Sequence, residues 1–383
     1  MVALILLLIA IIFSLASQTP TIVVSGGVTW INYFWVLPLI YLLISRFKSF
    51  SDKRLIPFYG YVVVFSIYCI ICEAFSSYYH YVSNDFRNLW ISLLIVAVSF
   101  VFYRNYGNTR SLRIISTVIL CGCLLLGINL YRNFFVDYNI SERVYAYAGK
   151  NSIGQIFLSA TIFSFIYMPK NLILKWTSIA CMLFLLILIF LLKARATILC
   201  FVICFVVLTL MLKDKRLKIS LVLIIAGSVI YLVANPNFIG LIINDIILNS
   251  SDTSNIDQIS SGRVGFIDEA LKLIPGHVLF GSGEYYVDCM PVNIFVEYGV
   301  VGFIIIFSYL LMIAKKILRL NFESKLNLCA LTLFLSNMLN SLFEAYPPFG
   351  PGVKCFMLWM ILGFALSQEN IMPLISPQVK TSG

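Results

Sequence analysis

The chain has 383 residues, of which 61% are hydrophobic and 11% are charged, and its formal net charge is +10. A soluble domain carries roughly 25% charged residues, so this composition excludes an ordinary soluble protein and predicts a polytopic all-α membrane protein. The excess of positive charge does not require a nucleic-acid partner. Lys and Arg residues in inner loops beside anionic membrane lipid explain this excess.

Apolar windows long enough to cross a bilayer recur from one end of the chain to the other. A hydrocarbon core about 30 Å thick needs about 20 helical residues for each crossing. We therefore predict about twelve transmembrane helices in a single membrane domain that covers residues 1–383. Their approximate ranges are 1–17, 28–44, 55–72, 89–103, 112–130, 153–168, 172–192, 196–212, 217–234, 291–313, 326–343 and 353–367.

The basic residues favour one set of alternating loops, and this asymmetry predicts the orientation of the bundle. Most of the 27 Lys and Arg residues lie in this set, near 46–54, 104–113, 170–175, 213–218 and 315–325. Loops rich in Lys and Arg stay in the cytoplasm. Both termini are thus expected to be cytoplasmic, and the other set of loops is expected to face outward.

The longest predicted outer connection covers residues 235–290, between the ninth and tenth predicted helices. A loop of this length in a compact protein is usually functional or disordered. Helical spacing puts the apolar residues of 264–274 on one arc and its charged residues on another, which predicts an amphipathic surface helix. Arg263 opens this helix on the apolar side, pointed towards the bundle, where an anionic partner is expected; the alternative is that it pairs with a nearby acidic residue or reaches a lipid headgroup.

Several motifs on the predicted outer side follow one another in a specific order. They are Asn151-Ser-Ile-Gly-Gln at a helix start, Lys193-Ala-Arg195-Ala-Thr at a hairpin, Arg263, Gly281-Ser-Gly283, and Asn293-Ile-Phe-Val-Glu297-Tyr-Gly299-Val-Val-Gly302 entering a span. In this order, over about residues 145–310, the motifs resemble the O-antigen polymerase and ligase superfamily.

The resemblance implies glycosyl transfer between lipid-linked saccharides at the outer face of a bacterial inner membrane. Donor and acceptor would be glycans on undecaprenyl diphosphate, with the diphosphate as leaving group and a chain-length regulator as a possible protein partner. Arg195 and Arg263 are the expected diphosphate ligands, because guanidinium groups donate in a fork that matches phosphate oxygens. Arg143 and Lys150 are further candidates for the same task, or for the diphosphate of the acceptor lipid.

A transfer reaction also needs a group that takes the proton of the acceptor hydroxyl. Glu297 matches the Glu-x-Gly-x-x-Gly element of the superfamily and is the candidate catalytic carboxylate; the alternative is that it pairs with an arginine or caps a helix. Asn293 is a candidate for substrate binding. Tyr285 and Tyr286 are candidates for stacking on sugar rings, although aromatic residues at this level also form the belt found at any membrane interface.

No metal and no cofactor are expected, because the chain has no Asp-x-Asp triplet and its two histidines lack a matched carboxylate spacing. Val292 stands where ligases of the superfamily carry a His, which favours the polymerase over the ligase. A divergent ligase is an alternative function. A lipid-linked glycan flippase or transporter is another, although the chain shows no clear repeat of its halves and almost no charge within its predicted spans.

Overall fold

The structure, a computed structural model, describes residues 1–24, 32–75, 82–141, 145–213, 215, 218–219, 222, 226, 234–235, 240–248, 262–283, 287–345, 348–349 and 355–368. Every regular element in these residues is a helix, and no strand occurs among them. The predicted all-α class is therefore confirmed for the described part of the chain.

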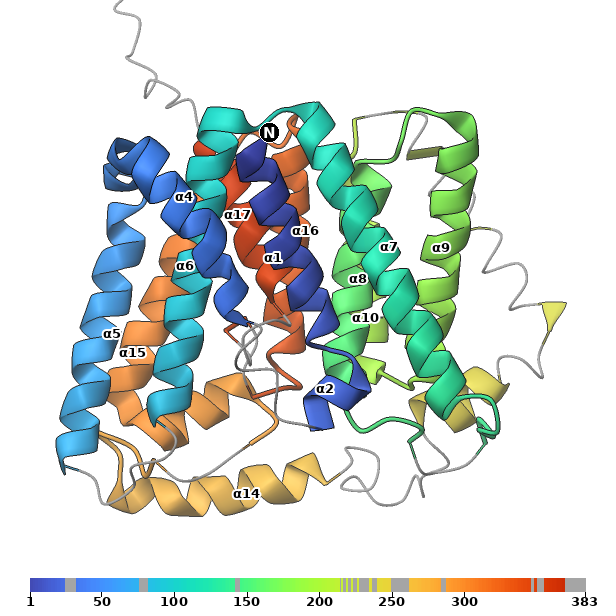
Figure 1. Cartoon of the computed structure of the whole chain (residues 1–383). Helices are drawn as coiled ribbons and strands as arrows, with labels where there is room; N and C mark the ends of the chain where they lie inside the picture. Colours follow the sequence, from blue (N-terminus) through green and yellow to red (C-terminus); the bar gives the residue numbers. More distant parts are fainter. Residues whose placement is uncertain are drawn as a thin grey trace, which may run out of the picture.

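Long helices run side by side through the molecule, and a short helix lies across one end of the bundle (Figure 1). In chain order the elements are α1 (Val2–Ala16), α2 (Pro20–Val24), η1 (Asn32–Trp35), α4 (Val36–Arg46), η2 (Phe47–Ser51), α5 (Ile56–Phe75), α6 (Val82–Tyr106), α7 (Thr109–Phe134), α8 (Lys150–Ile166), α9 (Leu172–Leu191), α10 (Arg195–Met211), η3 (Leu241–Ile247), α14 (Arg263–Leu273), η4 (Ile274–Gly276), α15 (Met290–Leu318), α16 (Lys325–Asn340) and α17 (Phe356–Ser367). The element across the end is α14, the predicted amphipathic helix.

In the described part of the chain, 6 helices are long and apolar enough to cross a membrane. They are Tyr33–Ser51, Ile56–Ala74, Arg87–Tyr106, Thr109–Phe134, Leu172–Leu191 and Met290–Leu318. Helices α1, α10 and α17 are apolar but shorter. A helix covers at least part of every other predicted span, whereas most of 217–234 lies outside the described residues, and its described residues 218–219, 222, 226 and 234 are helical. The count of about twelve crossings and the orientation of the bundle stay predictions.

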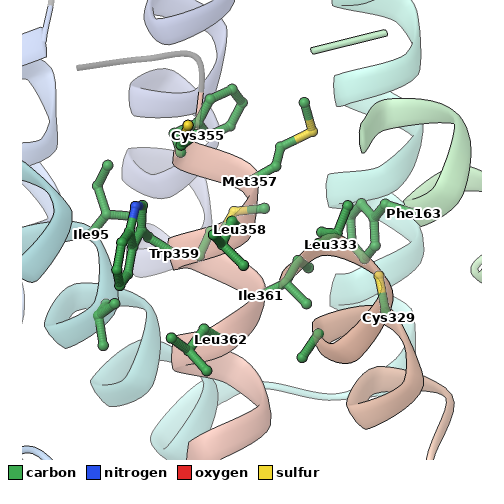
Figure 2. Close-up of a cluster of buried hydrophobic side chains, with 14 of the residues drawn as sticks. Ile95, Phe163, Cys329, Leu333, Cys355, Met357, Leu358, Trp359, Ile361 and Leu362 are labelled. Atoms are coloured by element: carbon green, nitrogen blue, oxygen red, sulfur yellow. The ribbon is translucent and has the colours of Figure 1, made fainter. Parts of the chain in front are cut away.

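Helix α17 is buried on all sides, as expected for a helix that is apolar around its whole circumference. Figure 2 shows Trp359 beside Ile95 of α6, with Ile361 on the side of α17 that faces α16. Helices α17 and α6 approach so closely that a Cβ atom on Gly363 would lie 2.5 Å from the carbonyl oxygen of Val96. Small residues permit such close helix packing inside a membrane.

Helix α15 is broken at Gly299, whose φ of 65° and ψ of −170° lie outside the helical region. The segment 278–283, which follows α14 and η4, crosses α15 at this break. Backbone hydrogen bonds join the two, from Val300 N–H to Val278 (2.8 Å), Val301 N–H to Leu279 (3.3 Å), Ser282 N–H to Val296 (2.7 Å) and Gly283 N–H to Glu297 (3.2 Å). Buried backbone groups need hydrogen-bond partners, and the crossing segment supplies them.

Glycine is required at both positions where the two backbones touch. A Cβ atom on Gly299 would lie 2.4 Å from the carbonyl oxygen of Leu279, and one on Gly281 would lie 2.3 Å from the carbonyl oxygen of Glu297. Both glycines also have positive φ, 65° and 76°. The glycine crossing, Gly281 over Gly299, therefore fastens the segment after α14 to α15.

Replacing Gly299 by Ala is expected to lower the free energy of unfolding by about 3 kcal/mol, because a side chain disfavours positive φ and its Cβ would overlap the backbone of Leu279. Gly276→Ala is the matched control, since nothing lies within 4 Å of a Cβ atom there. Thermal unfolding of both variants in detergent measures the difference. Equal unfolding midpoints for the two variants would contradict the role of the crossing.

Candidate functional site at the α14 end of the bundle

Polar side chains from several elements converge at the end of the bundle across which α14 lies (Figure 1). Helices α8, α10 and α15 begin at this end, and α16 finishes there. Asn151 of α8 donates a hydrogen bond to Glu344 beyond α16, at 2.5 Å. The Met290 N–H at the start of α15 donates to the carbonyl of Ser341, at 2.8 Å. The motifs identified in the sequence therefore meet at one end.

A tight turn between α9 and α10 sets the position of Arg195. Lys193 has a φ of 50°, which is uncommon for a residue other than glycine, and its side chain is fully buried with Nζ 5.9 Å from the centre of the Tyr138 ring. Arg195 is the first residue of α10. Helix α8 packs closely here, since a Cβ atom on Gly154 would lie 2.9 Å from Thr197 Oγ1. The starts of α8 and α10 therefore lie next to each other.

Tyr145 connects Lys150 with Arg195. The Lys150 ammonium lies over the Tyr145 ring, 2.7 Å from its centre, and Arg195 Nη2 donates to the Tyr145 hydroxyl at 3.3 Å. Aromatic rings attract cations placed over their faces, and a phenol oxygen accepts from a guanidinium group. One aromatic side chain thus holds both cations at the same end of the bundle.

Arg263 is the third cation of the group, because its positive charge contributes to the lowered pKa of Lys150. Lys150 precedes the predicted span 153–168. Burial and, in addition, repulsion from Arg195 and Arg263 lower the pKa of Lys150 from 10.5 to about 8, while Tyr145 acts in the opposite direction. The effect follows from desolvation and like charge, which both disfavour an ammonium ion. We call Lys150, Arg195 and Arg263 the cation cluster.

The guanidinium of Arg263 is incompletely satisfied. Its Nε lies 3.8 Å from Asp288 Oδ2, so the acidic neighbour expected from the sequence is present, but this distance is too long for a hydrogen bond. Among the described residues, the buried Nε has no hydrogen-bond acceptor. A buried donor without an acceptor costs about 1 to 3 kcal/mol, and more for a charged group. An anionic ligand oxygen would remove this cost.

Asn293 and Glu297 form a buried pair one turn apart on α15. The Asn293 amide donates from Nδ2 to Glu297 Oε2 at 2.9 Å, and its Oδ1 accepts from the Val287 N–H at 2.9 Å. Asn293, predicted to bind substrate, therefore uses both ends of its amide within the protein. It orients Glu297 and ties the chain before α15 to the helix.

Glu344 was missed as a site residue by the sequence reasoning, which placed it only at the end of a predicted span. Its partner Asn151 is 193 residues away, and one turn deeper Gln155 Nε2 donates to Ser336 Oγ of α16 at 3.0 Å. The only sequence signal was that both Asn151 and Glu344 lie at predicted outer ends of helices. Tyr145 gave a similarly weak signal, as one of many aromatic residues in the outer loops.

Three of the predicted site residues, Arg143, Tyr285 and Tyr286, lie outside the described residues. Within the part that is described, no three His, Cys, Asp or Glu side chains come together as ligands for a metal ion. The described site is therefore a group of cations with nearby carboxylates and amides.

Neither a protein-family model nor a curated protein sequence matches this chain. A function must therefore be inferred from the motifs and from the geometry of this end of the bundle.

Replacing Arg195 by Gln is expected to raise the pKa of Lys150 somewhat above its value of about 8, because the substitution removes one of the two positive charges that repel the ammonium while burial, the larger cause, stays. The pH dependence of Lys150 labelling by an amine-reactive reagent, read by mass spectrometry, measures this shift. Arg110→Gln, on an exposed residue at the start of α7, is the control. An unchanged Lys150 titration in the Arg195 variant would contradict the proximity of the two side chains.

Proposed function

We propose that the protein is a membrane glycosyltransferase of the O-antigen polymerase type. In this proposal it transfers a growing glycan from undecaprenyl diphosphate to the next lipid-linked repeat unit, at the outer face of the bacterial inner membrane. The end of the bundle with α14 faces outward, both termini are cytoplasmic, and the reaction uses no metal ion.

The observation that carries the proposal is the cation cluster with an unsatisfied donor. Cations held together against burial and mutual repulsion need a ligand of high negative charge, and Arg263 Nε lacks an acceptor among the described residues. Guanidinium groups match the oxygens of a phosphate group in geometry and charge. A diphosphate carries several such oxygens and suits a site of this kind.

The same arrangement suits the chemistry of transfer. When the bond between the anomeric carbon and the phosphate oxygen breaks, negative charge develops on the leaving diphosphate. Fixed cations in a site that excludes water stabilise this charge without having to reorganise. Arg195 and Arg263 each offer several N–H donors in a fixed fork. In this proposal they bind the diphosphate in both the donor and the product.

The position of the cluster favours transfer at a membrane face over transport through the bilayer. Its members lie where helices begin, at Lys150, Arg195 and Arg263, and a transported substrate would need polar residues along a path through the bundle. Val292, in place of the His that ligases of the superfamily carry, favours a polymerase within that superfamily.

A strain that lacks this gene is expected to make lipopolysaccharide with a single repeat unit and no ladder on a gel. The wild-type gene should restore the ladder. The Arg263→Ala variant should fail to restore it, because the diphosphate would lose a charge-assisted contact. Arg110→Ala, which removes an exposed arginine elsewhere in the chain, is the control and should restore the ladder.

Other gel patterns would contradict the proposal in recognisable ways. Bare core with no repeat unit would indicate a ligase or a flippase, and the side of the membrane on which lipid-linked repeats accumulate would distinguish these two. A full ladder with the Arg263→Ala variant at wild-type expression would show that Arg263 is not needed for the reaction.

A further inference from the structure

We propose that Lys150 accepts the proton of the acceptor hydroxyl during transfer, an inference that rests on the function proposed above. In this reaction the acceptor oxygen forms a bond to the anomeric carbon, the bond from that carbon to the diphosphate oxygen breaks, and the hydroxyl proton ends on Lys150 Nζ. Lys150 thus differs in role from the two arginines beside it.

The surroundings of Lys150 supply the geometric basis. Nζ faces the Tyr145 ring from the preceding loop, and both Arg195 at the start of α10 and Arg263 at the start of α14 are close enough to shift its titration. The Tyr145 hydroxyl is itself occupied by Arg195. Burial is the largest influence on the Lys150 ammonium and favours release of its proton, Tyr145 opposes that release, and the two arginines add a smaller repulsion.

The nearby carboxylates are engaged elsewhere. Asp288 lies beside Arg263, and Glu344 accepts a hydrogen bond from Asn151, the next residue along α8. Glu297 accepts a hydrogen bond from Asn293 inside α15. These contacts leave Lys150, held over the Tyr145 ring that also binds Arg195, as the proton acceptor of the cluster in this proposal.

The protonation equilibrium of Lys150 fits this role. With a pKa of about 8, roughly one lysine in ten is neutral at pH 7, and a neutral amine accepts a proton. Efficient proton acceptors have a pKa near the working pH. An ordinary lysine, with a pKa of 10.5, would be neutral in far fewer molecules.

The charge balance of the reaction supports the same assignment. The donor diphosphate gains about one negative charge when the glycan leaves, because its terminal phosphate becomes a monoester with a second ionisation near pH 6. The proton that moves from the acceptor hydroxyl to Lys150 adds one positive charge beside it. The amine therefore removes the proton and balances the new charge in one step.

This mechanism separates the pH dependence of turnover from that of binding. The neutral amine accepts the proton, so the rate at saturating substrate should rise with pH, around a value above 8 because the bound diphosphate raises the pKa of Lys150. The ammonium form attracts the anion, so affinity for diphosphate should fall as the pH rises above about 8. A lysine that only binds phosphate would lose both properties together at high pH.

The test uses the full-length protein in vesicles with lipid-linked repeat units extracted from the deletion strain, and it measures transfer rate against pH. Lys150→Arg keeps the positive charge but cannot accept a proton. It is expected to bind inorganic pyrophosphate like the wild type, while its transfer rate falls about 100-fold or more and no longer rises with pH. The matched control is Lys175→Arg, an exposed lysine on α9, which should keep the wild-type profile.

The outcomes separate failure of this inference from failure of the proposed function. If the wild-type protein forms no polymer from lipid-linked repeats, the proposed function is wrong. If the wild type forms polymer and Lys150→Arg shows the same rate and the same pH profile, the function stands and the proton acceptor is another group. A Glu297→Gln variant that alone loses the rise of the rate with pH would assign the proton to Glu297 and overturn the inference.

Discussion

The crossing of two backbones at Gly281 and Gly299 is the constraint on which the α14 end of the bundle depends. It breaks α15, satisfies the groups exposed by the break, and fastens the segment after α14 to that helix. Arg263 lies at the other end of α14, and Glu297 lies two residues before the break. One steric requirement, the absence of a side chain at two positions, therefore helps to position both a cation and a carboxylate.

The cation cluster is the second constraint, and unlike the glycine crossing it lowers the stability of the fold. Holding Lys150, Arg195 and Arg263 together opposes stability, since burial and like charge both disfavour the ammonium of Lys150. The protein offsets part of this cost through the Tyr145 ring and hydroxyl and through Asp288. A bound anion would relieve the remaining cost, and in the proposed function this anion is the diphosphate.

Apolar windows in the sequence allowed the helices of the described part to be predicted, because they report burial directly, whereas the choice of site motifs depended on a family resemblance. The sequence did not reveal the break at Gly299, since a glycine within an apolar run is equally compatible with a straight helix. Helix α6 begins at Val82, earlier than the predicted 89, because hydropathy marks the apolar part of a helix and not its polar continuation. Contacts such as Asn151 with Glu344 depend on packing between distant segments, which one sequence does not encode in any local pattern.

The most direct test of the central claim, that the cation cluster binds a lipid diphosphate, is native mass spectrometry of the purified protein with undecaprenyl diphosphate and undecaprenyl monophosphate. The account predicts that the wild type retains the diphosphate lipid in preference to the monophosphate. It also predicts that a variant with Gln at positions 150, 195 and 263 loses this preference. Equal retention of the two lipids by the wild type, or an unchanged preference in the triple variant, would contradict the claim.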